Sequence, residues 1–141
     1  MEINELRIGN HIEYCGYIAK VDGIDDRISA INIENKDHIF DKPSYFDPIE
    51  LTEEVLLKIG FKKEERISSI LYYLDYEING DEYFHVRYVI YNSKALPLLR
   101  ITSPSPIISE SYELTKRGIK YLHQLQNAYY CLTNNELEIE L

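Results

Sequence analysis

The chain has 141 residues, 45% of them apolar, so it is long enough for one domain with a core and too apolar to be disordered. Its formal net charge of −9 at pH 7 excludes generic binding to DNA or RNA, because contact with the phosphate backbone needs cations. No apolar run approaches the ~20 residues of a membrane span, and residues 1–5 lack the features of a signal peptide. We therefore expect a cytoplasmic protein that binds no membrane.

Residues 6–40 alternate short apolar stretches with turn residues, a pattern that predicts four or five short strands. Asp22-Gly23 is expected to form one of the tight turns between them. Such a series favours a small, curled antiparallel sheet of the SH3-like kind, followed by a polar connector at 41–48. The expected strands lie at 6–8, 11–14, 17–21, 27–33 and 38–40.

A short helix is predicted over residues 52–60. Thr52 is a favourable N-cap, because its hydroxyl can accept a hydrogen bond from the first turn. Gly60 suits the left-handed residue that ends many helices. Apolar residues at helical spacing indicate the buried side of this helix: Val55, Leu56 and Ile59.

Residues 67–101 predict a β-meander whose first hairpin turns at Asn79-Gly80. A two-residue loop would pair Ile78 with Asp81. A three-residue loop would pair Glu77 with Asp81 and move every side chain to the other face. We favour the three-residue loop, with Gly80 left-handed in a bulge. It predicts one face that buries Tyr72, Phe84 and Val86, and an opposite face made of Leu71, Tyr73, Asp75, Tyr83, His85 and Arg87.

A second helix is predicted over residues 114–132, after a proline-containing loop at 102–106. Residues 136–141 alternate glutamate with leucine or isoleucine, which predicts a closing edge strand whose glutamates face water. The expected fold is thus a single α+β domain over residues 1–141. It combines an N-terminal β unit, a short middle helix, a meander, a C-terminal helix and the closing strand. The expected buried stripe of the second helix is Ile119, Leu122, Leu125, Tyr129 and Leu132.

The two cysteines, Cys15 and Cys131, are far apart in sequence. In a reducing cytosol, free cysteines usually behave as small buried apolar residues. We expect both to be buried and structural.

The sequence contains none of the usual patterns of a catalytic site. The six glycines are scattered singly, so no phosphate-binding loop exists, and no serine elbow occurs. The histidines at 11, 38, 85 and 123 lack the spacing of metal ligands. We therefore expect a protein without enzymatic activity, cofactor or metal, and keep an unrecognised hydrolase as an alternative.

Two surfaces carry side chains suited to binding. The hairpin face offers Tyr73, Tyr83, His85 and Arg87, in which arginine can hold a phosphate or carboxylate and tyrosine rings can stack on a ligand. The alternative is a solvated sheet face with ordinary pairs, such as Tyr73 opposite His85.

The second surface is a helical stripe of His123, Asn127 and Tyr130, beside Gln124 and Gln126. These groups could bind a ligand or hold a neighbouring loop, and the alternative is that they cap sheet edges or face water.

A short basic cluster follows the middle helix. Because Glu64 and Glu65 balance its charge, we interpret it as a solvated surface rather than a binding site. The cluster consists of Lys58, Lys62, Lys63 and Arg66.

Three stretches carry a resemblance to known proteins: LRIGN at 6–10, PIELTEEVLLKIGF at 48–61, and KYLHQLQN at 120–127 with the run to residue 141. In this order they resemble a group of small uncharacterised proteins encoded by phages and prophages of gut Bacteroidales. The third stretch is the most specific, and residues 67–111 do not share the likeness. The resemblance implies a phage setting in a bacterial host and no particular reaction.

The expected function is therefore non-catalytic binding in the service of a phage. The first hypothesis is a protein that sequesters a host factor or a nucleotide-type signal molecule. The alternative is a protein–protein interaction module or a virion-associated structural component. A host protein, a small nucleotide-type ligand and a second copy of the chain are the expected partners.

Overall fold

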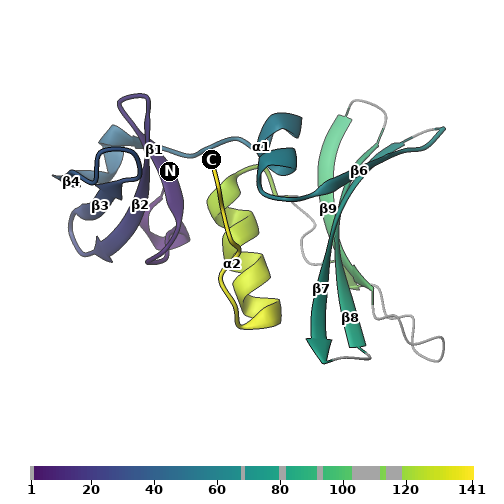
Figure 1. Cartoon of the computed structure of the whole chain (residues 1–141). Helices are drawn as coiled ribbons and strands as arrows, with labels where there is room; N and C mark the ends of the chain where they lie inside the picture. Colours follow the sequence, from purple (N-terminus) through teal and green to yellow (C-terminus); the bar gives the residue numbers. More distant parts are fainter. Residues whose placement is uncertain (1, 68, 80–81, 92–93, 103–111, 114–118) are drawn as a thin grey trace. The chain divides into compact units, whose positions relative to one another are not determined.

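The computed structural model describes residues 2–67, 69–79, 82–91, 94–102, 112–113 and 119–141 (Figure 1). Residues 69, 75–79, 82–91, 94–102, 112–113 and 132–133 are described by their backbone alone. The fold is α+β, as predicted. The chain forms two compact units, and the expected single domain stays a prediction. Unit 1 comprises Met1–Leu51 and Tyr121–Leu137, and unit 2 comprises Thr52–Lys120 and Glu138–Leu141.

Unit 1 contains a five-stranded antiparallel sheet, which confirms the small sheet expected near the N-terminus. The strand order is β4-β3-β2-β1-β5. Cys15 and Gly16 join β1 to β2 with φ of 49° and 83°, as a two-residue turn with two left-handed positions requires. The strands are β1 (His11–Tyr14), β2 (Tyr17–Ile24), β3 (Ile28–Asn32), β4 (His38–Asp41) and β5 (Phe46–Asp47).

Three local predictions in unit 1 are wrong. Residues 6–8 form no strand, because the Asn10 side chain accepts a hydrogen bond from the Arg7 amide and closes a turn after the 3₁₀ helix η1 (Ile3–Glu5). The polar connector at 41–48 contains a second 3₁₀ helix, η2 (Pro43–Tyr45), and the strand β5, whose Phe46 is buried. Asp22-Gly23 lies inside β2, where a register shift takes the place of the expected turn.

Alternate residues of the unit 1 sheet form its core. Burial along β3 alternates between buried and half-buried positions, so Ile28 and Ala30 face the core. Lys20 pairs with Ile31 across β2 and β3, which places both side chains on the opposite face of the sheet. The core residues are Ile12, Ala19, Val21, Ile28, Ala30 and Phe46.

Unit 2 begins with the predicted middle helix, α1 (Glu53–Lys58). The Thr52 hydroxyl accepts a hydrogen bond from the Val55 amide at 3.2 Å, and Gly60 has a φ of 94°. Both ends of the helix are therefore as predicted from the sequence. Leu56 and Ile59 are buried and Val55 is half-buried.

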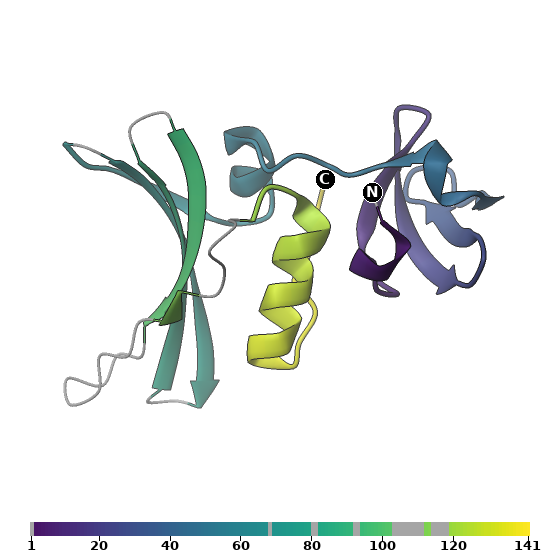
Figure 2. The ribbon, with the colours of Figure 1, turned by 180° about the vertical axis from the view of Figure 1, so that it is seen from behind.

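The predicted meander forms the sheet of unit 2, whose strand order is β10-β9-β8-β7-β6. The three central strands are long, lie side by side and curve together in both views (Figure 2). The charged strand β6 was not predicted. The strands are β6 (Lys62–Glu65), β7 (Ser69–Asn79), β8 (Glu82–Tyr91), β9 (Lys94–Thr102) and β10 (Tyr112–Glu113).

The hairpin of β7 and β8 has the predicted faces and a different register. Tyr72 pairs with Tyr88, and near the turn Asn79 pairs with Glu82 after a register shift at Ile78. The expected pair of Glu77 with Asp81 is therefore wrong. The observed register is displaced by two residues, and a shift of two does not exchange the faces that the alternation predicts. Gly80 lies outside the described residues.

Burial on this hairpin differs from the prediction at one position. Tyr72 is buried as expected, but Leu71 on the opposite face is buried too. The face of Leu71 is therefore not wholly exposed. The side chains of Phe84 and Val86 lie outside the described residues.

The second helix, α2 (Leu122–Thr133), begins later than predicted. Tyr121 is its N-cap, Ile119 and Lys120 precede it outside the helix, and 114–118 lie outside the described residues. Four of its predicted stripe positions are buried, and the Leu132 side chain is not described. The part of the chain that the structure describes holds no helix both long and apolar enough to span a bilayer.

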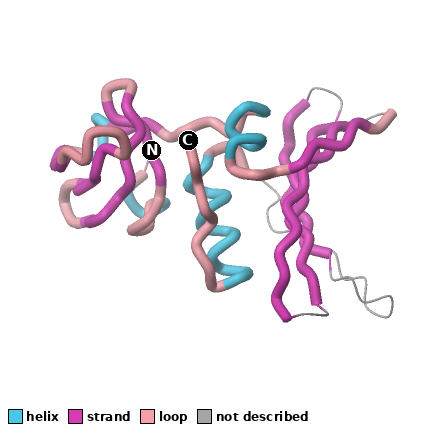
Figure 3. The backbone as a smooth tube through the Cα atoms, in the orientation of Figure 1, coloured by secondary structure: helices cyan, strands magenta, loops and turns pink. Residues whose placement is uncertain are grey.

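The prediction of a closing edge strand is wrong. Residues 136–141 form no ladder, and Figure 3 shows this segment as loop. Two side chains hold the segment instead: Leu137 is buried, and the Glu136 carboxylate binds Arg7.

Candidate functional site

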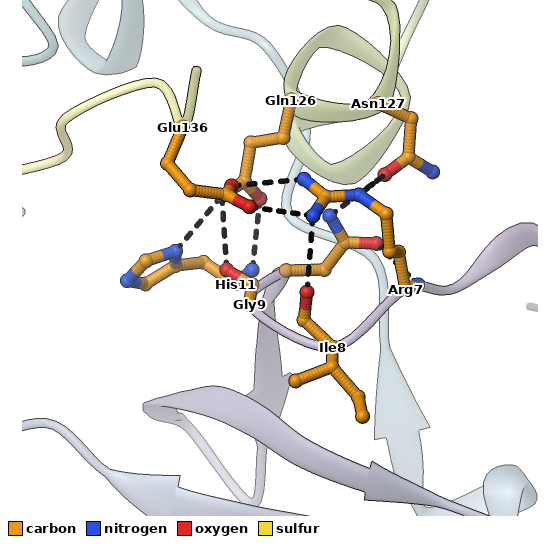
Figure 4. A network of polar contacts seen from close by, with 8 residues as sticks. Arg7, Ile8, Gly9, His11, Gln126, Asn127 and Glu136 are labelled. Atoms are coloured by element: carbon orange, nitrogen blue, oxygen red, sulfur yellow. Dashed lines mark hydrogen bonds and ion pairs between the residues drawn. The ribbon is translucent and has the colours of Figure 1, made fainter. Parts of the chain in front are cut away.

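The polar stripe of α2 lies against the segment that leads into β1. Its residues recur at helical spacing, so they share one side of the helix. Together they contact residues 5–11 and hold that segment (Figure 4). Of the roles expected for this stripe, the geometry agrees with holding a neighbouring segment. We call the stripe together with residues 5–11 the clamp. The stripe consists of His123, Gln126, Asn127 and Tyr130.

Gln126 is buried and binds the backbone on both sides of Asn10. Its Oε1 accepts a hydrogen bond from the His11 amide at 2.8 Å, and its Nε2 donates to the Gly9 carbonyl at 3.2 Å. The same Nε2 lies 3.1 Å from His11 Nδ1. Because the amide Nε2 of Gln126 is a donor, the His11 Nδ1 must accept. The neutral His11 ring therefore carries its proton on its own Nε2.

His11 is only 8% exposed, and its pKa is lowered from 6.5 to about 4. Burial is the largest cause, and the positive charge of Lys20 adds to it. If His11 Nδ1 were protonated, it would face the Gln126 Nε2, which is also a donor, and their hydrogen bond would be lost. The clamp therefore requires the neutral imidazole.

Asn127 connects three parts of the leading segment. Its Oδ1 accepts hydrogen bonds from Asn10 Nδ2 at 2.9 Å and from Arg7 Nε at 3.3 Å. Its Nδ2 donates to the Glu5 carbonyl at 2.8 Å. One side chain thereby holds the turn and the Arg7 guanidinium in place.

The Arg7 guanidinium lies at the centre of the network. Nη1 and Nη2 donate to the two Glu136 oxygens at 2.6 and 2.8 Å, and the guanidinium carbon lies 4.2 Å from the Tyr130 ring centroid. These hydrogen bonds raise the pKa of Arg7 and lower the pKa of Glu136. Nη1 also donates to the Ile8 carbonyl at 3.2 Å.

His123 is fully buried, and neither ring nitrogen has a hydrogen-bond partner among the residues that the structure describes. Its Nε2 lies 3.6 Å from a Glu5 carboxylate oxygen, and its ring stacks on Tyr121 at 5.9 Å between centroids. Burial lowers the pKa of His123, and the Glu5 carboxylate opposes that effect. The neutral ring therefore packs as an aromatic residue at the start of α2.

A groove of about 530 Å³ opens on unit 1, beside the clamp. The turn at Ile8 and Gly9 and the Glu136 side chain line it together with the face of β2 and β3 that points away from the core. Ile8 is 58% exposed and offers apolar area at the edge of the groove. The apolar lining consists of Ile8, Val21, Ile31 and Ile33.

The charged side chains around the groove differ in whether they have a hydrogen-bond or ion-pair partner. Glu136 binds Arg7, and Asp22 accepts a hydrogen bond from the Ser29 hydroxyl at 2.5 Å. The Lys20 ammonium, by contrast, has no hydrogen-bond or ion-pair partner within the described part of the chain. The groove therefore combines an apolar lining with a lysine that makes no direct ion pair among the described residues and lies within electrostatic range of Glu136.

A second lysine, Lys36, also lines the groove. Its Nζ donates to the Ile33 carbonyl at 2.6 Å, which leaves its charge uncompensated by a carboxylate.

Protein-family models, curated proteins and solved structures yield no match to this chain. The resemblance to the phage proteins is therefore still a hypothesis. Among the described residues, no group of three or more histidine, cysteine, aspartate or glutamate side chains is placed to hold a metal ion.

Of the predicted hairpin site, the structure describes the Tyr73 side chain and only the backbone of Tyr83, His85 and Arg87. Tyr73 pairs with Arg87, not with His85, and its half-buried ring lies 5.9 Å from the Lys62 ammonium. His85 pairs with Asp75 and Tyr83 with Glu77. The four residues share a face as expected, and the side chains of Tyr83, His85 and Arg87 lie outside the described residues.

Most of the basic cluster after α1 is paired with acidic residues. Lys58 binds Glu54, and Arg66 binds Glu64. Lys63 contacts both Glu53 and Glu65. These ion pairs support the interpretation as a solvated surface.

The prediction for both cysteines is wrong, because Cys15 and Cys131 are exposed. Cys15 occupies the first position of the β1–β2 turn, where the backbone directs the side chain away from the sheet.

Three residues of this site were not predicted from the sequence: Arg7, Lys20 and Glu136. The one available signal was the period of the β2–β3 hairpin, which puts Lys20 and Ile31 on its outer face.

Proposed function

We propose that the protein is a non-catalytic binding protein that holds a small molecule in the groove of unit 1. The ligand has an apolar body and an anionic group, a description that includes nucleotide-type signal molecules. One observation carries the proposal: an apolar groove contains the Lys20 ammonium, which makes no direct ion pair among the described residues, and the Glu136 carboxylate beside it is already bound by Arg7.

The size and charge of the groove support this ligand class. A volume of about 530 Å³ lies within the range of about 300–1,000 Å³ typical of small-molecule sites. The net charge of −9 repels anions at long range, so affinity must come from local contacts. Lys20 and Lys36 supply such contacts at the groove, and Ile8, Ile31 and Ile33 supply apolar area.

Calorimetry tests the proposal with mono-, di- and cyclic nucleotides and with aromatic and aliphatic carboxylates. Lys20→Ala is expected to weaken the binding of any ligand found, roughly tenfold for one lost charge-assisted contact. Lys42→Ala is the matched control, because it removes the same charge from an exposed position that does not line the groove. Equal effects of the two substitutions, or no binding by any compound, would contradict the proposed site.

The hairpin face remains a competing location for the same ligand. There Arg87 would hold the anion and Tyr73 and Tyr83 would stack on the apolar body. Loss of binding in Arg87→Ala, together with unchanged binding in Lys20→Ala, would assign the ligand to the hairpin.

The phage resemblance suggests what such binding would achieve. A phage protein in the bacterial cytoplasm that removes a host signal molecule needs affinity and no catalysis. The sequestration hypothesis predicts that the protein from infected cells retains a small molecule in native mass spectrometry.

A protein partner is the second candidate, and exposed aromatic side chains on unit 1 favour it. Tyr17, Phe40 and Tyr45 are each more than half exposed, and the Arg27 guanidinium carbon lies 5.5 Å from the Phe40 ring centroid. Retention of a host protein that Phe40→Ala releases and Lys20→Ala does not would support this function.

A further inference from the structure

We propose that Arg7 is the residue that binds the ligand's anionic group and that Glu136 occupies it as an internal competitor when no ligand is bound. The inference rests on the proposed function, because it names the anion position of the same groove. It assigns the ligand an oxyanion with two accessible oxygens, such as a carboxylate, a phosphate or a sulfonate.

Arg7 is held in position by contacts that do not involve Glu136. Asn127 Oδ1 accepts from its Nε at 3.3 Å, the Ile8 carbonyl accepts from Nη1 at 3.2 Å, and the Tyr130 ring lies under the guanidinium at 4.2 Å. The fork formed by Nη1 and Nη2 therefore keeps its orientation if the carboxylate leaves. Such a preorganised fork matches two oxygens of one oxyanion.

Glu136 depends on Arg7 to a much greater degree. Its side chain is 50% exposed, and Arg7 is its only hydrogen-bond partner among the described residues. It belongs to a segment without helix or strand that follows Asn134, so its displacement breaks no backbone ladder. The neighbouring Leu137 is buried and can keep the segment attached.

The carboxylate of Glu136 lies on the wall of the groove. It lines the groove with Gly9, and a Cβ atom built on Gly9 would lie 3.6 Å from Oε2. The carboxylate thus covers the Gly9 backbone where no side chain intervenes. Figure 4 shows it beside the Arg7 guanidinium.

Displacement of Glu136 changes the charge that an incoming anion meets. With the carboxylate in place, Arg7 is ion-paired and does not line the groove, which presents Lys20, Lys36 and the Asp22 carboxylate. Without it, the guanidinium becomes a third cation at the groove. A ligand oxyanion can therefore replace one bidentate ion pair by another, with the apolar contacts of its body as the net gain.

The test measures the affinity for anilinonaphthalene sulfonate, a fluorescent probe with an apolar body and an oxyanion. Glu136→Gln removes the competing charge and leaves a side chain of the same shape. It is expected to bind the probe roughly tenfold more tightly than the parent protein. Glu138→Gln is the matched control, because it removes one charge from an exposed residue of the same segment and is expected to leave the affinity unchanged.

A double-substitution cycle separates competition from simple charge repulsion. Arg7→Lys keeps the positive charge and loses the fork, so the gain from Glu136→Gln is expected to disappear in the Arg7→Lys background. A gain of the same size in that background, or no gain in Glu136→Gln alone, would overturn the role of Arg7. Far-ultraviolet circular dichroism of each variant verifies the fold.

The two proposals fail in different ways. If neither the parent nor Glu136→Gln binds the probe, or if Lys20→Ala leaves binding unchanged, the groove is not the site and both proposals fall. If Lys20→Ala weakens binding while Glu136→Gln does not strengthen it, the groove stands and the internal competitor is refuted.

Discussion

Acidification should weaken the protein by protonating His11. Its native pKa of about 4 lies below the usual 6.5, so the unfolded chain takes up the proton first as the pH falls. The contribution of the neutral ring to stability is therefore complete above about pH 6.5 and is lost as the pH falls toward about 4. His123, whose pKa is also lowered, acts in the same direction.

The size of the effect follows from the pKa difference. A shift from 6.5 to about 4 corresponds to about 3 kcal/mol at 1.36 kcal/mol per pKa unit. The exposed Lys20 contributes part of this shift, and solvent screens that contribution, which leaves about 2 kcal/mol.

Urea unfolding at a series of pH values measures this loss against His11→Gln, which cannot titrate and can still accept from Gln126. We expect the free-energy difference between the two proteins to change by about 2 kcal/mol between about pH 7 and pH 4. Titration of the histidine ring protons by NMR gives the pKa of His11 directly. Parallel stability curves, or a His11 pKa near 6.5, would refute this account of the clamp.

Three further outcomes are expected. Cys15 and Cys131 should both react rapidly with a thiol reagent in the native protein, because both are exposed, and slow reaction would show them covered. Cys15→Asn should stabilise the fold by about 0.5–1 kcal/mol in urea unfolding, since asparagine before Gly16 tolerates the left-handed backbone better. Thr52→Ala should cost about 1 kcal/mol through loss of the α1 cap, whereas Thr52→Ser should be nearly neutral.

Features with a local physical cause could be predicted from the sequence. Thr52 and Gly60 mark the two ends of α1 and could be recognised, because capping depends on a few neighbouring backbone atoms. The period of two along β7 and β8 fixed which side chains share a face, although the pairing is displaced by two residues. A displacement of two leaves the faces unchanged, so alternation alone cannot detect it.

Features that depend on distant partners could not be predicted in the same way. The apolar and polar residues at 6–8 alternate as in a strand, but the Arg7 side chain donates hydrogen bonds to Asn127 and Glu136 instead. Residues 136–141 alternate like an edge strand, yet the ion pair and the burial of Leu137 decide their path. The candidate site is made largely of such contacts, so the sequence indicated the helical stripe and missed the groove.

The discontinuity of unit 1 sets the order in which it can be completed on the ribosome. Arg7 and Glu136 are 129 residues apart, and at a synthesis rate of about 5–20 residues per second that interval lasts on the order of ten seconds. A nascent chain can assemble β1 to β5 long before α2 has been synthesised. Throughout that time Arg7 has no carboxylate opposite it, and the His11 amide and Gly9 carbonyl await Gln126. The nascent sheet is thus open to anions and to chaperones, and the groove acquires its Glu136 wall only when residues 122–136 emerge.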